Sequence, residues 1–319
     1  MSHQTSKRKN KKEFGVIGLG CMGGDLALQA IEKGWRVVGY NRSPERTRAL
    51  ARKGLVAASS LAELIGELKP PRIVLIYVPH GEPTRQMIAE LKGCLQKGDV
   101  VGDGGNSKWT DSLQHYAELK PGGISFLDIG TSGGVEGARH GACFMVGGDK
   151  EAFAEVEPLL RNLAVPDGVI HADPPGAGHF VKLIHNAIEF GMVQAMAEGV
   201  DLLARSDYQL DLPALFHTWN RGSVIRSWLV ELMERGLREN KLDELSSYVE
   251  DTREVKWAVE YALEKEAWIP VIAQSELAFY RYRDADSVAG KAVALLRHGY
   301  GGHPLHKKSE KSGRKETLK

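Results

Sequence analysis

Four polar side chains recur at helical spacing between residues 176 and 191, in the segment G-A-G-H-F-V-K-L-I-H-N-A-I-E-F-G. Lys182, His185, Asn186 and Glu189 stand at i, i+3, i+4 and i+7, so a helix would present all four on one face. In a partly desolvated cleft a lysine can act as a base and a carboxyl group as an acid. A solvated charged stripe is the alternative, but small and apolar residues flank the four positions. The pattern therefore favours a reacting face.

Two glycine-rich loops could meet this helix. One is D-G-G-N-S at 103–107 and the other is G-T-S-G-G at 130–134. Open α/β sheets bind ligands beyond the carboxyl ends of their strands, where both loops are expected to lie. The second loop can present consecutive backbone N–H groups and a hydroxyl to a carboxylate. Ordinary turns are the alternative for each loop taken singly.

A dinucleotide site is indicated near the start of the chain. Gly18-Leu19-Gly20-Cys21-Met22-Gly23 follows the apolar run F-G-V-I-G and precedes a helical pattern. This G-x-G-x-x-G spacing permits a tight turn, a close approach of the pyrophosphate and close packing of the helix, whose N-terminus faces the negative charge. The context predicts a bound nicotinamide dinucleotide.

The end of the second predicted strand indicates which dinucleotide binds. NAD enzymes usually carry Asp or Glu there, whereas this chain has Asn41, Arg42 and Ser43. Asn41 would not repel a 2′-phosphate, Arg42 could cover it and Ser43 could donate a hydrogen bond. NADP is therefore preferred, with NAD possible. The alternative is that Arg42 solvates a turn, and this reading is stronger for Arg46 and Arg48.

The elements that carry these residues divide the chain in two. Short apolar runs alternate with helical stretches in the first half, which predicts a doubly wound, mainly parallel α/β sheet of the Rossmann type over 13–173. After A-D-P-P-G-A-G the periodicity is helical, which predicts an all-α domain over 174–304. Residues 1–12 and 305–319 are expected to be flexible basic tails.

Composition limits the functional classes. The 42 Lys and Arg against 41 Asp and Glu leave a formal charge of +1, which gives the molecule no overall attraction to nucleic acid or to an anionic membrane. No apolar run approaches a membrane span, and the N-terminus has no hydrophobic secretion segment. Three widely separated cysteines lack metal-ligand spacing and fit a reducing compartment. We expect a cytoplasmic enzyme without disulfides or a metal.

Taken together, the motifs resemble those of the short form of the 6-phosphogluconate dehydrogenase (decarboxylating) family, in the β-hydroxyacid dehydrogenase superfamily. The resemblance runs from about Phe14 to His303. Its motifs, in order, are G-L-G-C-M-G, D-G-G-N-S, T-S-G-G-V-E-G-A-R-H-G, the 176–191 segment, G-S-V-I-R-S-W-L and R-H-G-Y-G-G-H. The pattern H-x-V-K-x-x-H-N-x-I-E is the most discriminating.

The resemblance implies oxidative decarboxylation of 6-phosphogluconate to ribulose 5-phosphate and CO2, a step of the pentose phosphate pathway. Lys182 would take the proton of the C3 hydroxyl and Glu189 would later protonate C1. Asn106, His185 and Asn186 would hold sugar hydroxyls, and the carboxylate would rest on Ser132, Gly133 and Gly134. The cofactor set implied is Gly18, Leu19, Gly20, Met22, Gly23, Asn41, Arg42, Ser43, Val78, Pro79 and Asn106.

The match is weaker around the substrate phosphate. Lys256, Arg297 and His303 match basic positions of the family, and in the family the last two reach a neighbouring subunit's site. This implies a homodimer or homotetramer with a shared site. Phe190 replaces a phosphate-binding tyrosine of the family, Ala258 replaces a threonine, and Phe279 stands in the place of an arginine. Arg281 and Arg283 are close enough in the sequence to substitute for that arginine. The exact phosphate ligands stay open.

Two other functions are compatible with parts of this pattern. A sibling β-hydroxyacid dehydrogenase acting on a small 3-hydroxy acid or glyoxylate would share the fold and the lysine, but would not need Glu189, Arg297 or His303. A non-catalytic nucleotide-sensing dimer would have no reason to keep Lys182 and Glu189 together. Catalytic turnover would distinguish a dehydrogenase from the nucleotide sensor.

Overall fold

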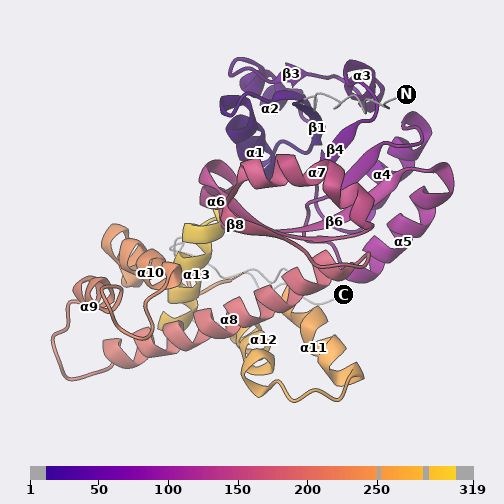
Figure 1. Cartoon of the computed structure of the whole chain (residues 1–319). Coiled ribbons are helices and arrows are strands. Elements are labelled where there is room, and N and C mark those ends of the chain that lie inside the picture. Colours follow the sequence, from indigo (N-terminus) through magenta and orange to yellow (C-terminus); the bar gives the residue numbers. More distant parts are fainter. Residues whose placement is uncertain (1–11, 250–252, 283–286, 307–319) are drawn as a thin grey trace, which may run out of the picture. The chain divides into compact units, whose positions relative to one another are not determined.

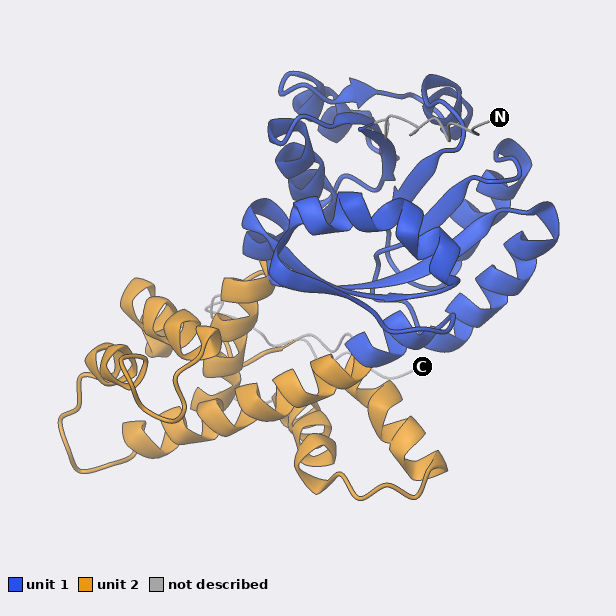
Figure 2. Ribbon diagram, in the orientation of Figure 1, with its two compact units in different colours: residues 1–182 blue, residues 183–319 orange. Residues whose placement is uncertain are grey.

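A computed structural model of the protein describes residues 12–249, 253–282 and 287–306. The polypeptide divides into two units within its longest helix, α8 (Ala177–Ala204) (Figure 2). Residues 1–182 form the first unit and residues 183–319 the second. Nearly all of the two predicted tails, 1–12 and 305–319, lies outside the described residues.

A mainly parallel sheet forms the centre of the first unit (Figure 1). Its strand order is β3-β2-β1-β4-β5-β6-β7-β8, and β6 and β7 are the antiparallel pair. The predicted Rossmann class is therefore confirmed. The strands are β1 (Glu13–Ile17), β2 (Arg36–Tyr40), β3 (Val56–Ala57), β4 (Ile73–Ile76), β5 (Val100–Asp103), β6 (Ser125–Ser132), β7 (Ala142–Gly147) and β8 (Ala164–His171).

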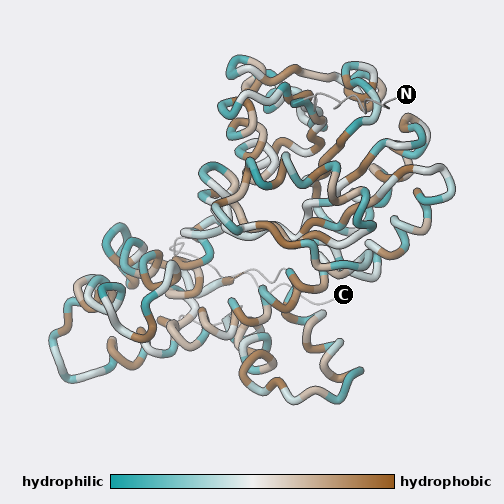
Figure 3. The backbone as a smooth tube through the Cα atoms, viewed as in Figure 1, coloured by the Kyte–Doolittle hydropathy of each residue, from teal (hydrophilic) through white to brown (hydrophobic). Residues whose placement is uncertain are grey.

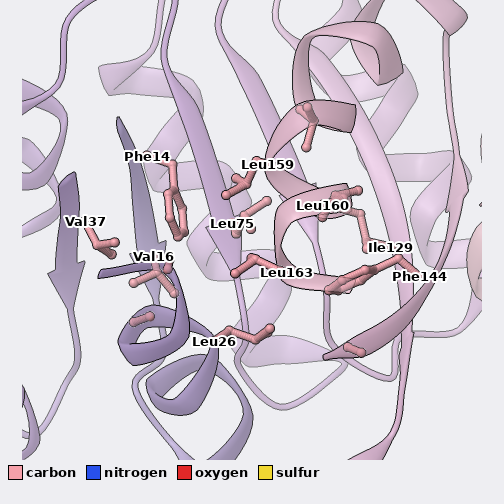
Figure 4. Packing of buried hydrophobic residues seen from close by; sticks show 14 of the residues in the cluster. Phe14, Val16, Leu26, Val37, Leu75, Ile129, Phe144, Leu159, Leu160 and Leu163 are labelled. Atoms are coloured by element: carbon pink, nitrogen blue, oxygen red, sulfur yellow. The ribbon is translucent and has the colours of Figure 1, made fainter. Parts of the chain in front are cut away.

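Helices cover both faces of this sheet, because both faces of its strands carry apolar side chains. The helices of the first unit are α1 (Cys21–Glu32), α2 (Pro44–Ala51), α3 (Leu61–Glu67), α4 (Glu82–Cys94), α5 (Trp109–Leu119), α6 (Gly134–His140) and α7 (Lys150–Leu163). One core joins the sheet to α1 and α7, and Figure 4 shows its packing. A second core joins the opposite face to α3 and α4. The brown, apolar strands of Figure 3 lie between these layers.

The second unit is helical throughout its described residues, as predicted. After α8 come α9 (Leu212–Trp219), α10 (Trp228–Glu239), α11 (Glu254–Glu264), α12 (Pro270–Tyr282) and α13 (Val288–Gly301), with a 3-10 turn at Leu242–Glu244. A core that includes Val200, Phe216, Met233, Phe279 and Leu296 joins α8, α9, α10, α12 and α13. In the described part of the chain, no helix has the combination of length and apolar content needed to cross a membrane.

Candidate active site

The glycine-rich loop lies at the turning point of the strand order. Between β1 and α1, Gly18 adopts φ +88°, in the region that favours glycine, and a Cβ there would overlap the carbonyl oxygen of Tyr77 at the end of β4. β1 and β4 are neighbours from which the connections run in opposite directions, which is where doubly wound sheets bind dinucleotides. A Cβ on Gly20 would meet no atom within 4 Å. The loop is thus open where a pyrophosphate would approach the N-terminus of α1.

Two side chains from the end of β2 and from α2 fix this loop. The Leu19 N–H donates to Asn41 Oδ1 at 2.9 Å, and Arg46 Nε donates to the Leu19 carbonyl oxygen at 2.8 Å. Arg46 was expected chiefly to solvate its helix, so this brace is a role that its position in the sequence did not indicate. Arg42 and Ser43 remain exposed beside the loop. They are therefore accessible to a group on the ribose.

Tyr77 links three of the predicted loops. Its carbonyl group lies against Gly18, its ring lies against Gly104, and its hydroxyl is 3.2 Å from Thr131 Oγ1 at the end of β6. Burial raises the pKa of the Tyr77 hydroxyl far above its ordinary value, so this hydroxyl stays neutral. The residues that follow it, Val78 and Pro79, border the same region, and the Pro79 carbonyl oxygen accepts from Thr84 Oγ1 at 2.9 Å. Tyr77 was not identified from the sequence.

A buried carboxylate shapes the loop that carries Asn106. Asp103, at the end of β5, accepts the Gly105 N–H at 3.0 Å and the Ser107 hydroxyl at 2.7 Å. Asp103 and Ser107 are buried while Asn106 between them is exposed. The loop therefore presents the Asn106 amide outward on a fixed backbone.

The loop after β6 also keeps its predicted residues accessible. Ser132, Gly133 and Gly134 are half-buried, and the two glycines have φ of +117° and +59° as they enter α6. Such a backbone exposes successive N–H groups, which suits an anion.

A second buried carboxylate fixes the start of α8. Asp128 Oδ1 accepts the Gly176 N–H at 2.7 Å and Oδ2 accepts the His179 N–H at 2.8 Å. The His179 ring, 2% exposed, in turn lies with Nδ1 2.7 Å from Ser112 Oγ on α5. Asp128 therefore caps the helix N-terminus and binds it to β6. His179 is the first residue of the pattern H-x-V-K-x-x-H-N-x-I-E, but the sequence assigned a role neither to it nor to Asp128.

The first turns of α8 pack tightly against the sheet. A Cβ on Gly130 of β6 would lie 2.5 Å from Lys182 Cβ, and a Cβ on Gly178 would overlap the carbonyl oxygen of Asp128. The glycines of this helix thus admit the backbone of the sheet. The contact leaves the Lys182 side chain 8% exposed at the end of the first unit.

In the second unit, the other three residues of the predicted face lie close together. His185 Nδ1 is 3.2 Å from Asn186 Oδ1 and 3.6 Å from Glu189 Oε2. Burial raises the pKa of the Tyr300 hydroxyl on α13 well above its ordinary value, and the negative charge of Glu189 raises it further. The predicted i, i+3, i+4, i+7 spacing therefore falls within one continuous helix, because α8 includes all four residues.

Two of the three predicted cations meet in one pocket of the second unit. Arg297 and His303 line it together with Tyr248, Val249, Ala294, Pro304 and His306. The guanidinium of Arg297 lies 5.7 Å from the ring centroids of both Phe190 and Phe279. Lys256 is exposed on α11 and does not line this pocket. Arg281 is exposed on α12, and Arg283 lies outside the described residues.

Nucleotide-binding loops at the turning point of a doubly wound sheet, followed by a helical unit, are typical of nicotinamide-dependent dehydrogenases. Residues 13–171 match the family model described as the NAD binding domain of 6-phosphogluconate dehydrogenase, and residues 178–286 match that of the C-terminal domain of the same enzyme. The chain belongs to the 6-phosphogluconate dehydrogenase family. It is an NAD(P)-dependent oxidoreductase.

Individual relatives agree with this membership. The chain is 44% identical to the putative 6-phosphogluconate dehydrogenase YqeC of Bacillus subtilis over 93% of its length and all of the relative's. It is 37% identical to the NAD(+)-dependent decarboxylating enzyme of Haloferax volcanii, with the same coverage. The solved 6-phosphogluconate dehydrogenase of Plasmodium falciparum superposes with a TM-score of 0.76 at 28% identity, over 85% of this chain and 62% of the other.

Proposed function

We propose that the protein oxidises and decarboxylates 6-phospho-D-gluconate to D-ribulose 5-phosphate and CO2, with NADP as preferred acceptor and NAD as a possible one. The observation that carries the proposal is the Lys182, His185, Asn186 and Glu189 series on α8, which supplies a base and an acid two turns apart. Family membership and the decarboxylating activity in the names of relatives support it.

A nicotinamide dinucleotide held by the loop of Gly18, Gly20 and Gly23 would supply the acceptor for the hydride of the substrate's C3. Lys182 takes the proton of the C3 hydroxyl in the same step, which leaves a 3-keto acid. The keto group accepts the electron pair as the bond between C1 and C2 breaks and the carboxyl carbon leaves as CO2. Glu189 then protonates the former C2 of the resulting enediolate, which is C1 of the pentose product. These two proton transfers account for the base and the acid.

The remaining candidates are proposed to hold the substrate. Asn106, His185 and Asn186 bind its hydroxyls, and the loop of Ser132, Gly133 and Gly134 binds its carboxylate. Arg297 and His303, with Lys256, bind the phosphate. The pocket that Arg297 and His303 share supports the pairing of these two residues, and the bidentate geometry of a guanidinium suits a phosphate.

Stoichiometry tests the function directly. Purified protein with 6-phosphogluconate and NADP is expected to form NADPH and CO2 in equal amounts, measured by absorbance and by trapping labelled CO2. Reduction without CO2 would instead favour a sibling dehydrogenase of small 3-hydroxy acids. Absence of any reduction with either cofactor would favour the nucleotide sensor.

The cofactor preference is tested at Arg42. Because its exposed guanidinium lies beside the loop, Arg42→Ala is expected to raise the Michaelis constant for NADP about tenfold, about 1.4 kcal/mol, and to change that for NAD much less. Arg48→Ala is the matched control, since Arg48 is exposed on α2 and pairs with Glu45 at 3.0 Å. Equal effects on the Michaelis constants of both cofactors would indicate that Arg42 only solvates the turn.

We further propose a homodimer or homotetramer with an active site shared between subunits, located in the cytoplasm. Large apolar side chains are exposed on two helices of the second unit: Ile188 (53%) and Met192 (42%) on α8, and Val271 (67%) and Leu277 (54%) on α12. Exposed apolar surface of this kind favours association. The free thiols of Cys21, Cys94 and Cys143 suit a reducing compartment. A monomer by light scattering would contradict the shared site.

A further inference from the structure

Tyr77 contacts three of the loops that are proposed to bind cofactor and substrate, and the proposed reaction assigns it no role. It directly follows β4, and its N–H donates to the carbonyl oxygen of Ile17 on β1 at 2.7 Å. On the cofactor side its carbonyl group lies against Gly18, and a Cβ on Gly23 would lie 2.9 Å from Tyr77 Cβ. The backbone of Tyr77 is therefore fixed against the loop that is proposed to hold the dinucleotide.

The ring of Tyr77 fills the space beside the loop that carries Asn106. A Cβ on Gly104 would overlap the hydroxyl end of the ring, so the ring fits because residue 104 has no side chain. The Gly104 N–H donates to the carbonyl oxygen of Ile76 at 2.8 Å, next to Tyr77 in the chain. The ring thus sets how closely this second loop approaches the end of β4.

The hydroxyl of Tyr77 reaches the end of β6. It lies 3.2 Å from Oγ1 of Thr131, a side chain that is 8% exposed. The Thr131 hydroxyl can donate to the carbonyl oxygen of Ile129 at 3.4 Å, which leaves its lone pairs to accept from Tyr77. Burial raises the pKa of the Tyr77 hydroxyl far above its ordinary value, so this hydroxyl keeps the proton that it donates.

Thr131 stands between two residues of the proposed site. Gly130 lies against the side chain of Lys182, and Ser132 begins the loop proposed to bind the substrate carboxylate. We propose that Tyr77 is a positioning residue, which holds this end of β6 at a fixed distance from the dinucleotide loop. The proposal rests on the proposed function, because it concerns where the substrate lies relative to the hydride acceptor.

Tyr77→Phe removes the hydroxyl and keeps the ring. We expect kcat/KM for 6-phosphogluconate to fall about three- to tenfold, through a higher Michaelis constant and a lower kcat, because the end of β6 loses its hydrogen bond. Slower hydride transfer should also raise the kinetic isotope effect on kcat for substrate deuterated at C3. The dissociation constant of NADPH should not change, since the backbone of Tyr77 makes the contact with Gly18.

Thr131→Val tests the same hydrogen bond from its other side. It should reproduce the changes seen with Tyr77→Phe, and the effect of Tyr77→Phe should disappear in the Thr131→Val background. Tyr116→Phe is the matched control, because Tyr116 is also a half-buried tyrosine of the first unit and its hydroxyl donates to Asp149 Oδ1 at 2.8 Å. It should leave the Michaelis constant and the isotope effect unchanged.

Two results would overturn the proposal. One is a loss of kcat alone in Tyr77→Phe, with the Michaelis constant and the isotope effect unchanged, because a smaller folded fraction gives that result. The other is a full further loss when Tyr77→Phe is added to Thr131→Val. If Tyr77→Phe does not fold, Thr131→Val decides by the same measurements. A wild-type protein that reduces NADP without releasing CO2 would instead overturn the proposed function, and this stoichiometry is measured first.

Discussion

Lys182→Met is expected to lower kcat for the reduction of NADP by about 10³-fold, because a positioned general base contributes roughly 10²- to 10⁴-fold. Methionine keeps the unbranched apolar stem but has no amine to accept the C3 proton. The stem is the part of Lys182 that packs beside Gly130, so the helix should keep its contact with β6. Binding of the dinucleotide, measured by fluorescence titration of NADPH, should therefore stay near the wild-type value.

Val181→Met is the control for this change. It introduces the same side chain one residue earlier on α8, at a position that is 39% exposed and has no proposed role in the chemistry. It should retain kcat within a small factor. Near-normal rates for Lys182→Met would remove Lys182 as the base, whereas a loss of NADPH binding would indicate a damaged cofactor site.

The periodicity of the sequence was sufficient to predict most of the elements. The apolar runs F-G-V-I-G, W-R-V-V-G-Y, I-V-L-I-Y-V, V-V-G-D and F-L-D-I predicted β1, β2, β4, β5 and β6, and the change to helical spacing predicted the helices that follow. Three strands were not predicted. β3 has only two residues, β8 contains Pro166 and Gly168, and β7 runs antiparallel within a sheet whose other pairs are parallel. A short, interrupted or reversed strand leaves little period in the sequence.

Some residues of the candidate site could be predicted from the sequence and others could not. Lys182, His185, Asn186 and Glu189 could be proposed as site residues because their spacing follows from the geometry of one helix. The residues that position this helix face, including Asp128, were not identified, since their partners come from elements distant in the sequence. A buried carboxylate or tyrosine has no local period, and only the tertiary fold shows which N–H or hydroxyl it meets.

The structure explains two of the replacements at the family's phosphate-binding positions, Phe190 and Phe279. Phe190 and Phe279 lie 5.1 Å apart between ring centroids, and each ring lies 5.7 Å from the Arg297 guanidinium. A guanidinium over aromatic rings is stabilised by the interaction of its charge with their π-electrons. Phe190 and Phe279, whose side chains cannot bind a phosphate, can thus orient Arg297, whose guanidinium can.

Asp128→Asn is expected to cause the largest loss of stability among single isosteric changes near the site. The buried carboxylate accepts two backbone N–H groups at the start of α8, and an amide has one oxygen, so its NH2 group would face an N–H donor. Hydrogen bonds to a charged group contribute about 1.5–3 kcal/mol each, and leaving a buried donor unsatisfied adds to the loss. We expect a destabilisation of about 3 kcal/mol, which lowers Tm by about 6–12 °C for a unit of this size.

Calorimetry or circular dichroism with and without NADP measures this effect. Asp167→Asn is the matched control, because Asp167 is exposed and its φ of 59° is a conformation that asparagine tolerates. If Asp128→Asn melts like the wild type, the carboxylate does not hold α8. If it is destabilised as expected, kcat should fall as well, because the residues that follow on α8 take their position from the turn that Asp128 caps, and a displacement of about 1 Å at a reacting group costs about 10²-fold.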